Sequence, residues 1–470
     1  MRIEKEYVKT GYFWLPEQKD NKIPGVLTIH DGGSIELEVL GSFDSTIHEF
    51  NNLNLIRVIG HIEDDGLVTL ENCFYTNKDF SFGGISKSKI IVNKVLSGVA
   101  YDKDEEVTFD SLSFSVDCID EWIGIGGFQM KDYFELNTVT INYTQPQNIL
   151  YLLNNGIQLE ICFGSSVPIP SNTTTEIKIT QNMYFKLKSN VLKPLKDFTD
   201  IAYKLTNFMC FAVDDIVTLK NLTATSLEIQ REVIKGKPSS VPIYIYYQSI
   251  PHSEKIPNKS MHKMLFTYGV IKSNAQDIFN NWLNAYEDLS PAIELYFSTK
   301  TDSYKYLEGK FLALAQGLET YHRRTSDETL MDLNEFDSLV KMMIEKCPEE
   351  QRDWLNGRLK YGNEISFSKR VQQIIEPFKN KLGNSKKRTS IIRKIVDTRN
   401  YLTHYNEDLK NVAAMNGDEL WSLCQTMEVI FQLHFLKVIG FNDKEINSVI
   451  ENYYPLKEKL NKVNNKKRIS

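Results

Sequence analysis

The sequence has few cysteines, no long apolar run and no excess of positive charge, and each lack excludes a class of protein. Its six cysteines are scattered. They lack the paired spacing and neighbouring histidines of a zinc site, and a disulfide framework is not expected in a chain of this length. No apolar stretch approaches the roughly 18 residues that a membrane helix needs. The net charge of −6 excludes a general nucleic-acid coater.

Several catalytic signatures are also missing from the chain. It contains no Gly-rich phosphate loop, no GxSxG elbow and no HExxH helix. What remains is the composition of an ordinary globular protein, with 25% charged residues and 470 residues to divide among two or three domains. The first residues are charged, so we expect no signal peptide and a cytoplasmic protein without membrane association.

Residues 1–270 have the sequence pattern of a β domain. Short runs of β-branched and aromatic residues alternate with Gly, Asn and Asp turns, and Asp31-Gly32-Gly33 is a strong hairpin signal. Many closely spaced strands favour a sandwich or a barrel-like sheet. One interruption, residues 191–213, has helical periodicity. No catalytic constellation is evident here, so we expect a sensing or regulatory domain.

Residues 271–470 are predicted to be a helical bundle, because nearly every segment shows apolar residues at helical spacing. Asp332 with Glu335 and Asn442 with Glu445 have the form of helix-starting capping boxes. The chain is therefore expected to be an α+β multidomain protein, with the β-rich part first and an all-α part second.

The stretch 391–405, IIRKIVDTRNYLTHY, is the most informative in the chain. On a helix, four of its polar side chains form one stripe, since they follow at spacings of four, three and four: Arg393, Asp397, Asn400 and His404. Arg399 instead falls between Ile395 and Leu402 on the apolar side, where a charge is costly unless it is paired or faces a site. We interpret this stretch as a catalytic helix for phosphodiester chemistry.

Two polar features accompany this helix. Residues 383–394 concentrate positive charge just before it, and are expected to form either a phosphate-contacting loop that binds RNA or a solvated loop: Lys386, Lys387, Arg388, Arg393 and Lys394. Glu319, His322 and Arg323 are expected to share one face of an earlier helix. The single Glu-x-x-His does not suffice for a di-iron centre, so no metal is expected. The alternatives for this cluster are support for the catalytic helix or a surface salt-bridge patch.

These residue types suit RNA cleavage without a metal or another cofactor. A histidine can act as general base or acid near neutral pH, and an arginine matches phosphate oxygens with its planar fork. A single His404 supplies half of the acid/base pair. Two copies across a two-fold axis would supply both halves, so the chemistry favours a homodimer with a composite site.

The Arg399, Asn400 and His404 pattern on a late helix of an all-α domain resembles the signature of HEPN ribonucleases. The segment FLALAQGLETYHRR is similar to the early helix of ApeA-type HEPN domains. The N-terminal segment GYFWLPEQKDNKIPGVLTIHDGGSIELEVLGSF is similar to the start of the β-rich domain that precedes HEPN in those bacterial anti-phage proteins.

This resemblance implies an abortive-infection endoribonuclease. The N-terminal domain would sense a phage-derived trigger, and the HEPN domain would cleave host RNA, for which tRNA is one candidate. Arg399 would stabilise the phosphate, His404 would act as general acid/base and Asn400 would position either the phosphate or the imidazole. Asp397, Glu319, His322 and Arg323 would support them.

Two other readings stay open. The chain could be a non-enzymatic HEPN protein that dimerises or binds RNA, with Arg399 as a structural charge. It could also hold a different enzyme in its β half, although no motif there indicates one.

Overall fold

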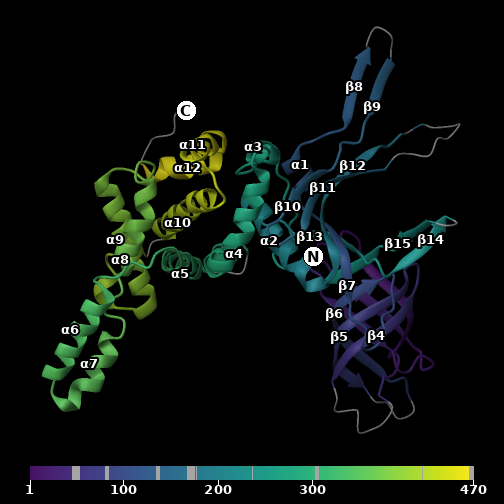
Figure 1. Ribbon diagram of the computed structural model, residues 1–470, viewed down its shortest axis with the longest axis horizontal. Helices are drawn as coiled ribbons and strands as arrows, with labels where there is room; N and C mark the ends of the chain where they lie inside the picture. The colour runs from purple at the N-terminus through teal and green to yellow at the C-terminus, as the bar shows by residue number, and fades with distance from the viewer. Residues whose placement is uncertain are drawn as a thin grey trace. The chain divides into compact units, whose positions relative to one another are not determined.

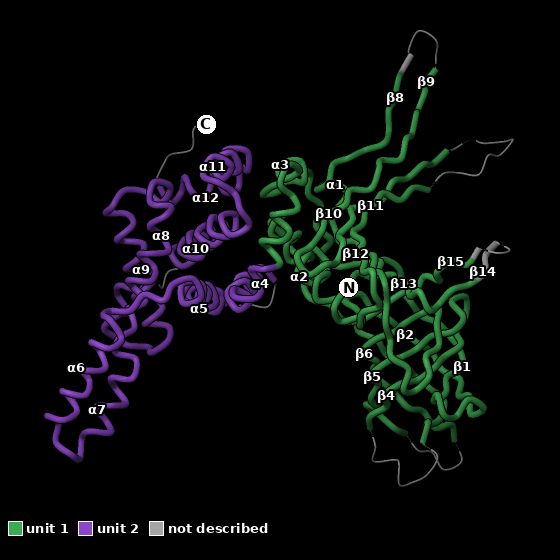
Figure 2. The backbone as a smooth tube through the Cα atoms, in the orientation of Figure 1, with its two compact units in different colours: residues 1–283 green, residues 284–470 purple. Residues whose placement is uncertain are grey.

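The computed structural model describes residues 1–44, 53–79, 84–133, 138–166, 175, 177–234, 237–301, 306–414 and 417–464. The chain divides into two compact units, residues 1–283 and 284–470 (Figure 2). The first unit is β-rich and the second is helical (Figure 1), which confirms the predicted fold class.

The first six strands close into a barrel. Closure follows because β6 pairs with both β3 and β5, while β1 pairs with both β2 and β4. The hairpin expected at Asp31 joins β2 to β3, and its two glycines have φ of 95° and 86°. The strands are β1 (Tyr7–Trp14), β2 (Ile23–Ile29), β3 (Ile35–Val39), β4 (Asn54–Ile62), β5 (Gly66–Asp79) and β6 (Lys87–Ser97).

The barrel interior is filled by the alternate apolar residues of these strands, such as Leu27, Leu37 and Val58. Phe13 is fully buried among them. Its ring needs a neighbour without a side chain, since a Cβ on Gly60 would lie 2.7 Å from the ring and 2.8 Å from Val68. Glycine at this position therefore leaves room for the Phe13 ring inside the barrel.

The remaining strands extend the same twelve-stranded sheet. The extension starts at β6, which pairs with β5 along one edge. On its other edge, residues 88–92 pair with β3 and residues 94–97 pair with β16. Two hairpins, β8–β9 and β14–β15, form separate two-stranded sheets and project from this unit (Figure 1). The bounds are β7 (Thr108–Val116), β8 (Phe128–Tyr133), β9 (Thr138–Tyr143), β10 (Ile149–Leu152), β11 (Gln158–Ser166), β12 (Thr180–Pro194), β13 (Leu219–Thr225), β14 (Gln230–Ile234), β15 (Lys237–Ser240) and β16 (Ile243–Tyr247).

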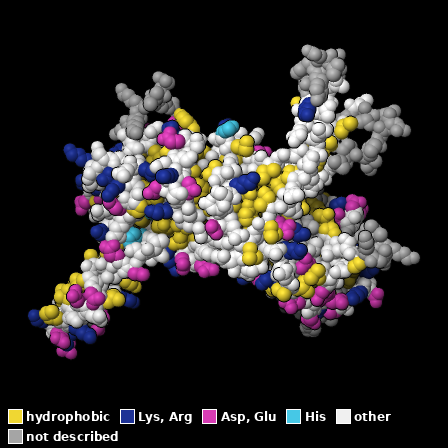
Figure 3. Space-filling model, turned by 45° about the horizontal axis from the view of Figure 1, so that its top comes forward, with side chains coloured by type: hydrophobic (Ala, Val, Ile, Leu, Met, Phe, Trp, Pro, Cys, Tyr) yellow, Lys and Arg dark blue, Asp and Glu magenta, His cyan; other side chains and the backbone are white. Residues whose placement is uncertain are grey.

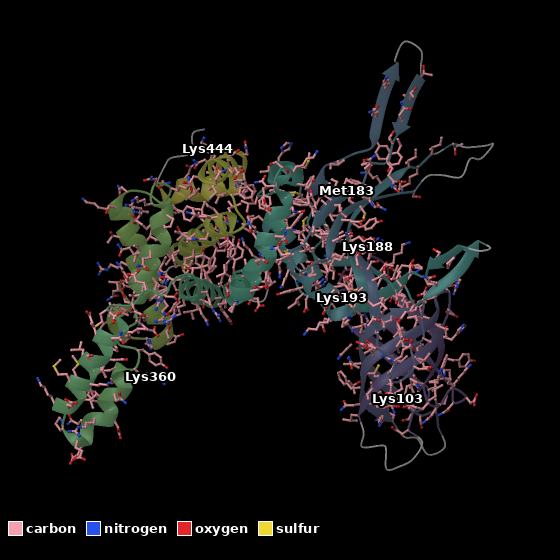
Figure 4. All side chains as sticks on the ribbon, viewed as in Figure 1. Lys103, Met183, Lys188, Lys193, Lys360 and Lys444 are labelled. Atoms are coloured by element: carbon pink, nitrogen blue, oxygen red, sulfur yellow. The ribbon has the colours of Figure 1, made fainter. Side chains whose placement is uncertain are left out.

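The helix α2 (Leu195–Val213) packs on β7 and β12. Residues 191–194, which we predicted as helix, are instead the end of β12. That strand is irregular between Lys188 and Lys193, which Figure 4 labels along it. A proline at position 194 precedes the first helical residue, and its fixed φ of −55° suits the position before a helix. The short α1 (Ile119–Ile123) packs against β12.

The helical unit is built around α10, which packs against α5 and α12. Tyr296, Phe431 and Phe435 form an aromatic cluster at its centre, with ring centroids 5.2–5.5 Å apart. Within the described residues, no helix has both the length and the apolar character needed to cross a bilayer. Of the helices that follow β16, α3 (Tyr268–Ile271) belongs to the first unit and α4 (Ala275–Ser298) crosses the boundary between the units. The others are α5 (Leu307–Thr325), α6 (Leu333–Lys346), α7 (Arg352–Leu359), α8 (Phe367–Ile375), α9 (Ser385–His404), α10 (Gly417–Val438), α11 (Asp443–Asn452) and α12 (Tyr454–Val463).

Glu428 on α10 is a buried carboxylate surrounded by three lysines of the helical unit. Its oxygens lie 2.8 Å from Lys310, 3.0 Å from Lys459 and 3.5 Å from Lys300. Burial alone would raise the pKa of Glu428, but the three ammonium groups outweigh burial and hold that pKa at about 2. The charged carboxylate of α10 therefore binds Lys300 just after α4, Lys310 in the first turn of α5 and Lys459 within α12.

Replacing Gly60 tests the barrel packing. We expect Gly60→Ala to lower the free energy of unfolding by about 2 kcal/mol, because the added methyl overlaps the Phe13 ring. Gly126→Ala is the control, since a Cβ there meets nothing within 4 Å. The measurement is urea unfolding followed by circular dichroism. Equal stability of both variants would contradict the packing argument.

Replacing Glu428 tests the lysine cluster. Because the folded-state pKa lies below that of the unfolded chain, the carboxylate stabilises the fold above about pH 5 and loses its contribution as pH falls toward 2. We expect Glu428→Gln to cost about 3 kcal/mol at pH 7 and progressively less at acid pH. Chemical unfolding of both proteins across this pH range provides the check, and a pH-independent difference would refute the assignment.

Candidate active site

The helix α9 starts earlier than we expected. Asn384 is its N-cap, with Oδ1 accepting a hydrogen bond from the backbone N–H of Lys387. The helix ends at His404, after which Tyr405 takes a left-handed conformation with φ of 50°. The predicted loop over residues 383–394 is therefore wrong for most of its length, because residues 385–394 form the first turns of α9.

Arg399 is paired, as its position on the apolar side required. Its Nη2 donates to Oε2 of Glu319 on α5 at 3.3 Å, and its Nη1 donates to Oδ1 of Asn400 at 3.2 Å. The guanidinium also lies over the ring of Phe367, the first residue of α8, with 5.4 Å between Cζ and the ring centroid. About a third of the side chain stays exposed, at 32%. One cation is thus fixed by three helices and still open to solvent.

The exposed side of Arg399 faces a groove between α5 and α9. The groove has a volume of about 470 Å³. Two arginines and one carboxylate give it its charge, and the other polar groups in it are an amide and two hydroxyls: Gln316, Glu319, Thr320, Arg323, Arg399 and Thr403 line it together with Leu312. Such a set matches an anionic ligand with hydrogen-bonding oxygens.

Glu319 also holds a second arginine. Its Oε1 accepts from Nη2 of Arg323 at 3.1 Å, and the same Nη2 lies 2.6 Å from Oε2 of Glu364. The pairing with Glu364, ahead of that with Glu319, raises the pKa of Arg323. An alternating series of charges therefore runs from Arg399 through Glu319 and Arg323 to Glu364.

His322 does not share the face of its neighbours, contrary to our expectation. It is buried toward α8, where Nε2 lies 2.5 Å from Oε1 of Gln373 and Nδ1 lies 3.2 Å from Nη1 of Arg370. Burial, and then the charge of Arg370, lower its pKa, so His322 is neutral and donates from Nε2. At three residues from Glu319 it is turned away from the groove, whereas Arg323 at four residues faces it.

The other residues of the predicted polar stripe have different surroundings from one another. Asp397 pairs with Arg393 at 3.3 Å, rather than with Arg399 or His404 as we expected. Asn400 contacts Arg399 directly. His404 is exposed in the last turn of α9, one residue beyond Thr403 of the groove.

The basic residues of α9 divide between different neighbours. Arg388 donates from Nη1 to the backbone oxygens of Lys379 and Gly383, and so closes the turn before the helix. Lys394 pairs with Glu419 at 3.3 Å. Lys386 is exposed and Lys387 half-exposed. Three of the five basic side chains, Arg388, Arg393 and Lys394, thus have partners within the helical unit.

Sequence reasoning missed the groove residues Gln316, Thr320 and Thr403 and the outer partner Glu364. None of them stands out by spacing, since they become neighbours only when α5, α8 and α9 pack. In the described part of the chain, no three His, Cys, Asp or Glu side chains are grouped as a metal site would require.

Two protein-family models match the chain. The model for ApeA N-terminal domain 1 matches residues 8–282, more than half of the chain. The model for the Apea-like HEPN domain matches residues 312–445, which include Glu319, Arg399 and His404. No curated protein and no solved structure matches significantly.

Truncating Arg388 and Lys386 separates structural from surface charges on α9. We expect Arg388→Ala to lower the free energy of unfolding by about 1 kcal/mol, because two backbone oxygens lose their donor. Lys386→Ala, at an exposed position, should leave it unchanged. Thermal unfolding of the two variants gives the answer, and an equal effect of both would show that the turn does not depend on Arg388.

Proposed function

We propose that this chain, which belongs to the ApeA family and carries a C-terminal HEPN domain, is a metal-independent endoribonuclease of anti-phage defence. HEPN domains generally dimerise, bind RNA and act as ribonucleases. The finer assignment depends on the chemistry of the groove between α5 and α9.

The observation that carries the proposal is the state of Arg399. Its guanidinium is oriented by Glu319, Asn400 and Phe367, yet about a third of the side chain stays exposed, and Arg399 lines a groove with other hydrogen-bonding groups. A fixed cation that need not reorganise is what a developing charge on a phosphate requires. Arg399 would therefore bind the scissile phosphate and stabilise the extra charge of its transition state.

His404 would supply proton transfer. In metal-independent cleavage, a base removes the proton of the ribose 2′-OH and the oxygen attacks phosphorus. The 5′-oxygen then leaves with a proton from an acid. One His404 can take one of these roles for a given phosphate, so a second copy would supply the other. Its exposed position in the last turn of α9 leaves it accessible to such a copy.

The β-rich unit would restrain this activity until a phage-derived trigger binds it, since an unrestrained ribonuclease would damage its own cell. The RNA substrate would be cytoplasmic, with tRNA as one candidate. Arrest of the infected cell would then follow from loss of that RNA.

A non-catalytic HEPN protein is the second candidate. It is favoured by the pairing of Arg399 with Glu319, which would also satisfy a purely structural charge. In that case the chain would bind RNA or dimerise without cleaving RNA.

The decisive comparison uses Arg399→Ala and His404→Ala. Each is expected to lower the rate of RNA cleavage by at least ~10²-fold, the usual contribution of one general acid/base or one charge-stabilising group. The measurement is induced expression in bacteria with and without phage, followed by total RNA on a gel and by cleavage with purified protein.

The matched control is Lys444→Ala, which removes an exposed charge from the first turn of α11, outside the groove and outside the basic segment of α9. Wild-type cleavage by folded Arg399→Ala would refute the catalytic assignment. RNA binding without cleavage by the wild type, at every trigger tried, would favour the non-catalytic candidate.

A further inference from the structure

The hairpin formed by α6 and α7 is an unusual part of the helical unit. Neither helix buries any residue, although both carry apolar side chains. In Figure 3 its surface mixes hydrophobic, acidic and basic groups, and Trp354 is 62% exposed. Helices of 14 and 8 residues are marginal without packing. The position of the hairpin must therefore be set at its stem.

The stem consists of two short segments, residues 328–331 and 361–364, next to Lys360, which Figure 4 labels on the hairpin. Leu330 donates its backbone N–H to the oxygen of Asn363 at 2.9 Å, and Met331 donates to Oδ1 of Asn363 at 2.9 Å. Thr329 and Glu364 form an antiparallel bridge. These bonds fix the two segments to each other.

Carboxylates on both stem segments connect to α5 and α8. Glu328 accepts a hydrogen bond from Nε2 of Gln373, whose Oε1 holds His322. Glu364 lies 2.6 Å from Arg323 and 3.5 Å from Arg370. The stem is thus anchored to α5 and α8, and one of its partners, Arg323, lines the groove.

At Arg323, one nitrogen is shared between two carboxylates. Nη2 lies 2.6 Å from Glu364 and 3.1 Å from Glu319. Removing the closer carboxylate would let Arg323 turn fully onto Glu319. The attraction between Glu319 and Arg399 would then orient Arg399 less firmly, because Arg323 would compete for the same carboxylate. The contact between Glu319 and Arg399 is already the longer one, at 3.3 Å.

We infer that Glu364 is a positioning residue for Arg399, acting through Arg323 and Glu319, and that it makes the geometry of the cleavage site depend on the stem of the α6–α7 hairpin. This inference deepens the proposed function and depends on it. Glu364 itself does not line the groove. Glu364 would affect RNA cleavage by keeping the guanidinium of Arg399 in the orientation that binds the phosphate.

The test is the steady-state kinetics of RNA cleavage by Glu364→Gln, which removes the charge and keeps the shape. We expect kcat to fall about tenfold and KM to stay within about twofold, because a misplaced cation affects the transition state more than binding. Glu345→Gln is the matched control, since Glu345 is exposed on α6 of the same hairpin. It should cleave like the wild type.

A double-mutant cycle separates positioning from a general structural role. If Glu364 acts through Arg323, adding Glu364→Gln to an Arg323→Gln protein should cause no further loss, because the guanidinium that would compete with Arg399 for Glu319 is already absent. Independent effects would multiply, so that the double variant would cleave about tenfold more slowly than Arg323→Gln alone. Urea unfolding of each variant shows whether the fold is intact.

The outcomes are distinguishable from those of the proposed function. If Arg399→Ala abolishes cleavage but Glu364→Gln has wild-type kcat, or if the double variant shows the multiplied loss, the inference is overturned and the nuclease assignment stands. If Arg399→Ala cleaves normally, the nuclease assignment itself fails, and the inference fails with it.

Discussion

The helical unit depends on how one charge is accommodated. Arg399 projects from a side of α9 that otherwise packs against neighbours, and an unpaired charge there would cost several kcal/mol. Glu319 supplies the opposite charge from α5, and Phe367 supplies an aromatic face from α8. The packing of three helices and the orientation of the candidate phosphate-binding group therefore have the same physical cause.

The fold class was readable from the sequence because alternation and helical periodicity are local. The choice between a sandwich and a barrel was not. It depends on β6 (Lys87–Ser97) pairing with both β3 and β5, which closes the ring, and such pairing is not visible in any one local pattern. The end of β12 was misread as helix because periodicity alone does not detect the change at Pro194, although a proline before a helix is a known start signal.

Some features of the site were likewise predictable from the sequence, and others were not. The place of Arg399 among apolar residues indicated that it is paired or faces a site. The ion pair between Arg393 and Asp397 was not predicted, because Asp397 was expected to support Arg399 or His404. The basic segment was misread as a loop, although Asn384 is a favourable N-cap residue and marked the true start of α9. Glu364 gave no signal, since its importance arises only where α5 and the hairpin stem meet.

The pairing of β6 with β16 also constrains how the chain can fold during its synthesis. Residues 94–97 hydrogen-bond to 244–247, far later in the sequence, whereas the helical unit is rich in contacts between nearby helices. Loop-closure entropy makes such a long-range pairing slow. During synthesis the six barrel strands are complete by residue 97, but the extension of the sheet stays unfinished until β16 (Ile243–Tyr247) has left the ribosome. The edge of β6 that awaits β16 is exposed in the meantime, and a nascent chain in that state is a substrate for chaperones or for aggregation.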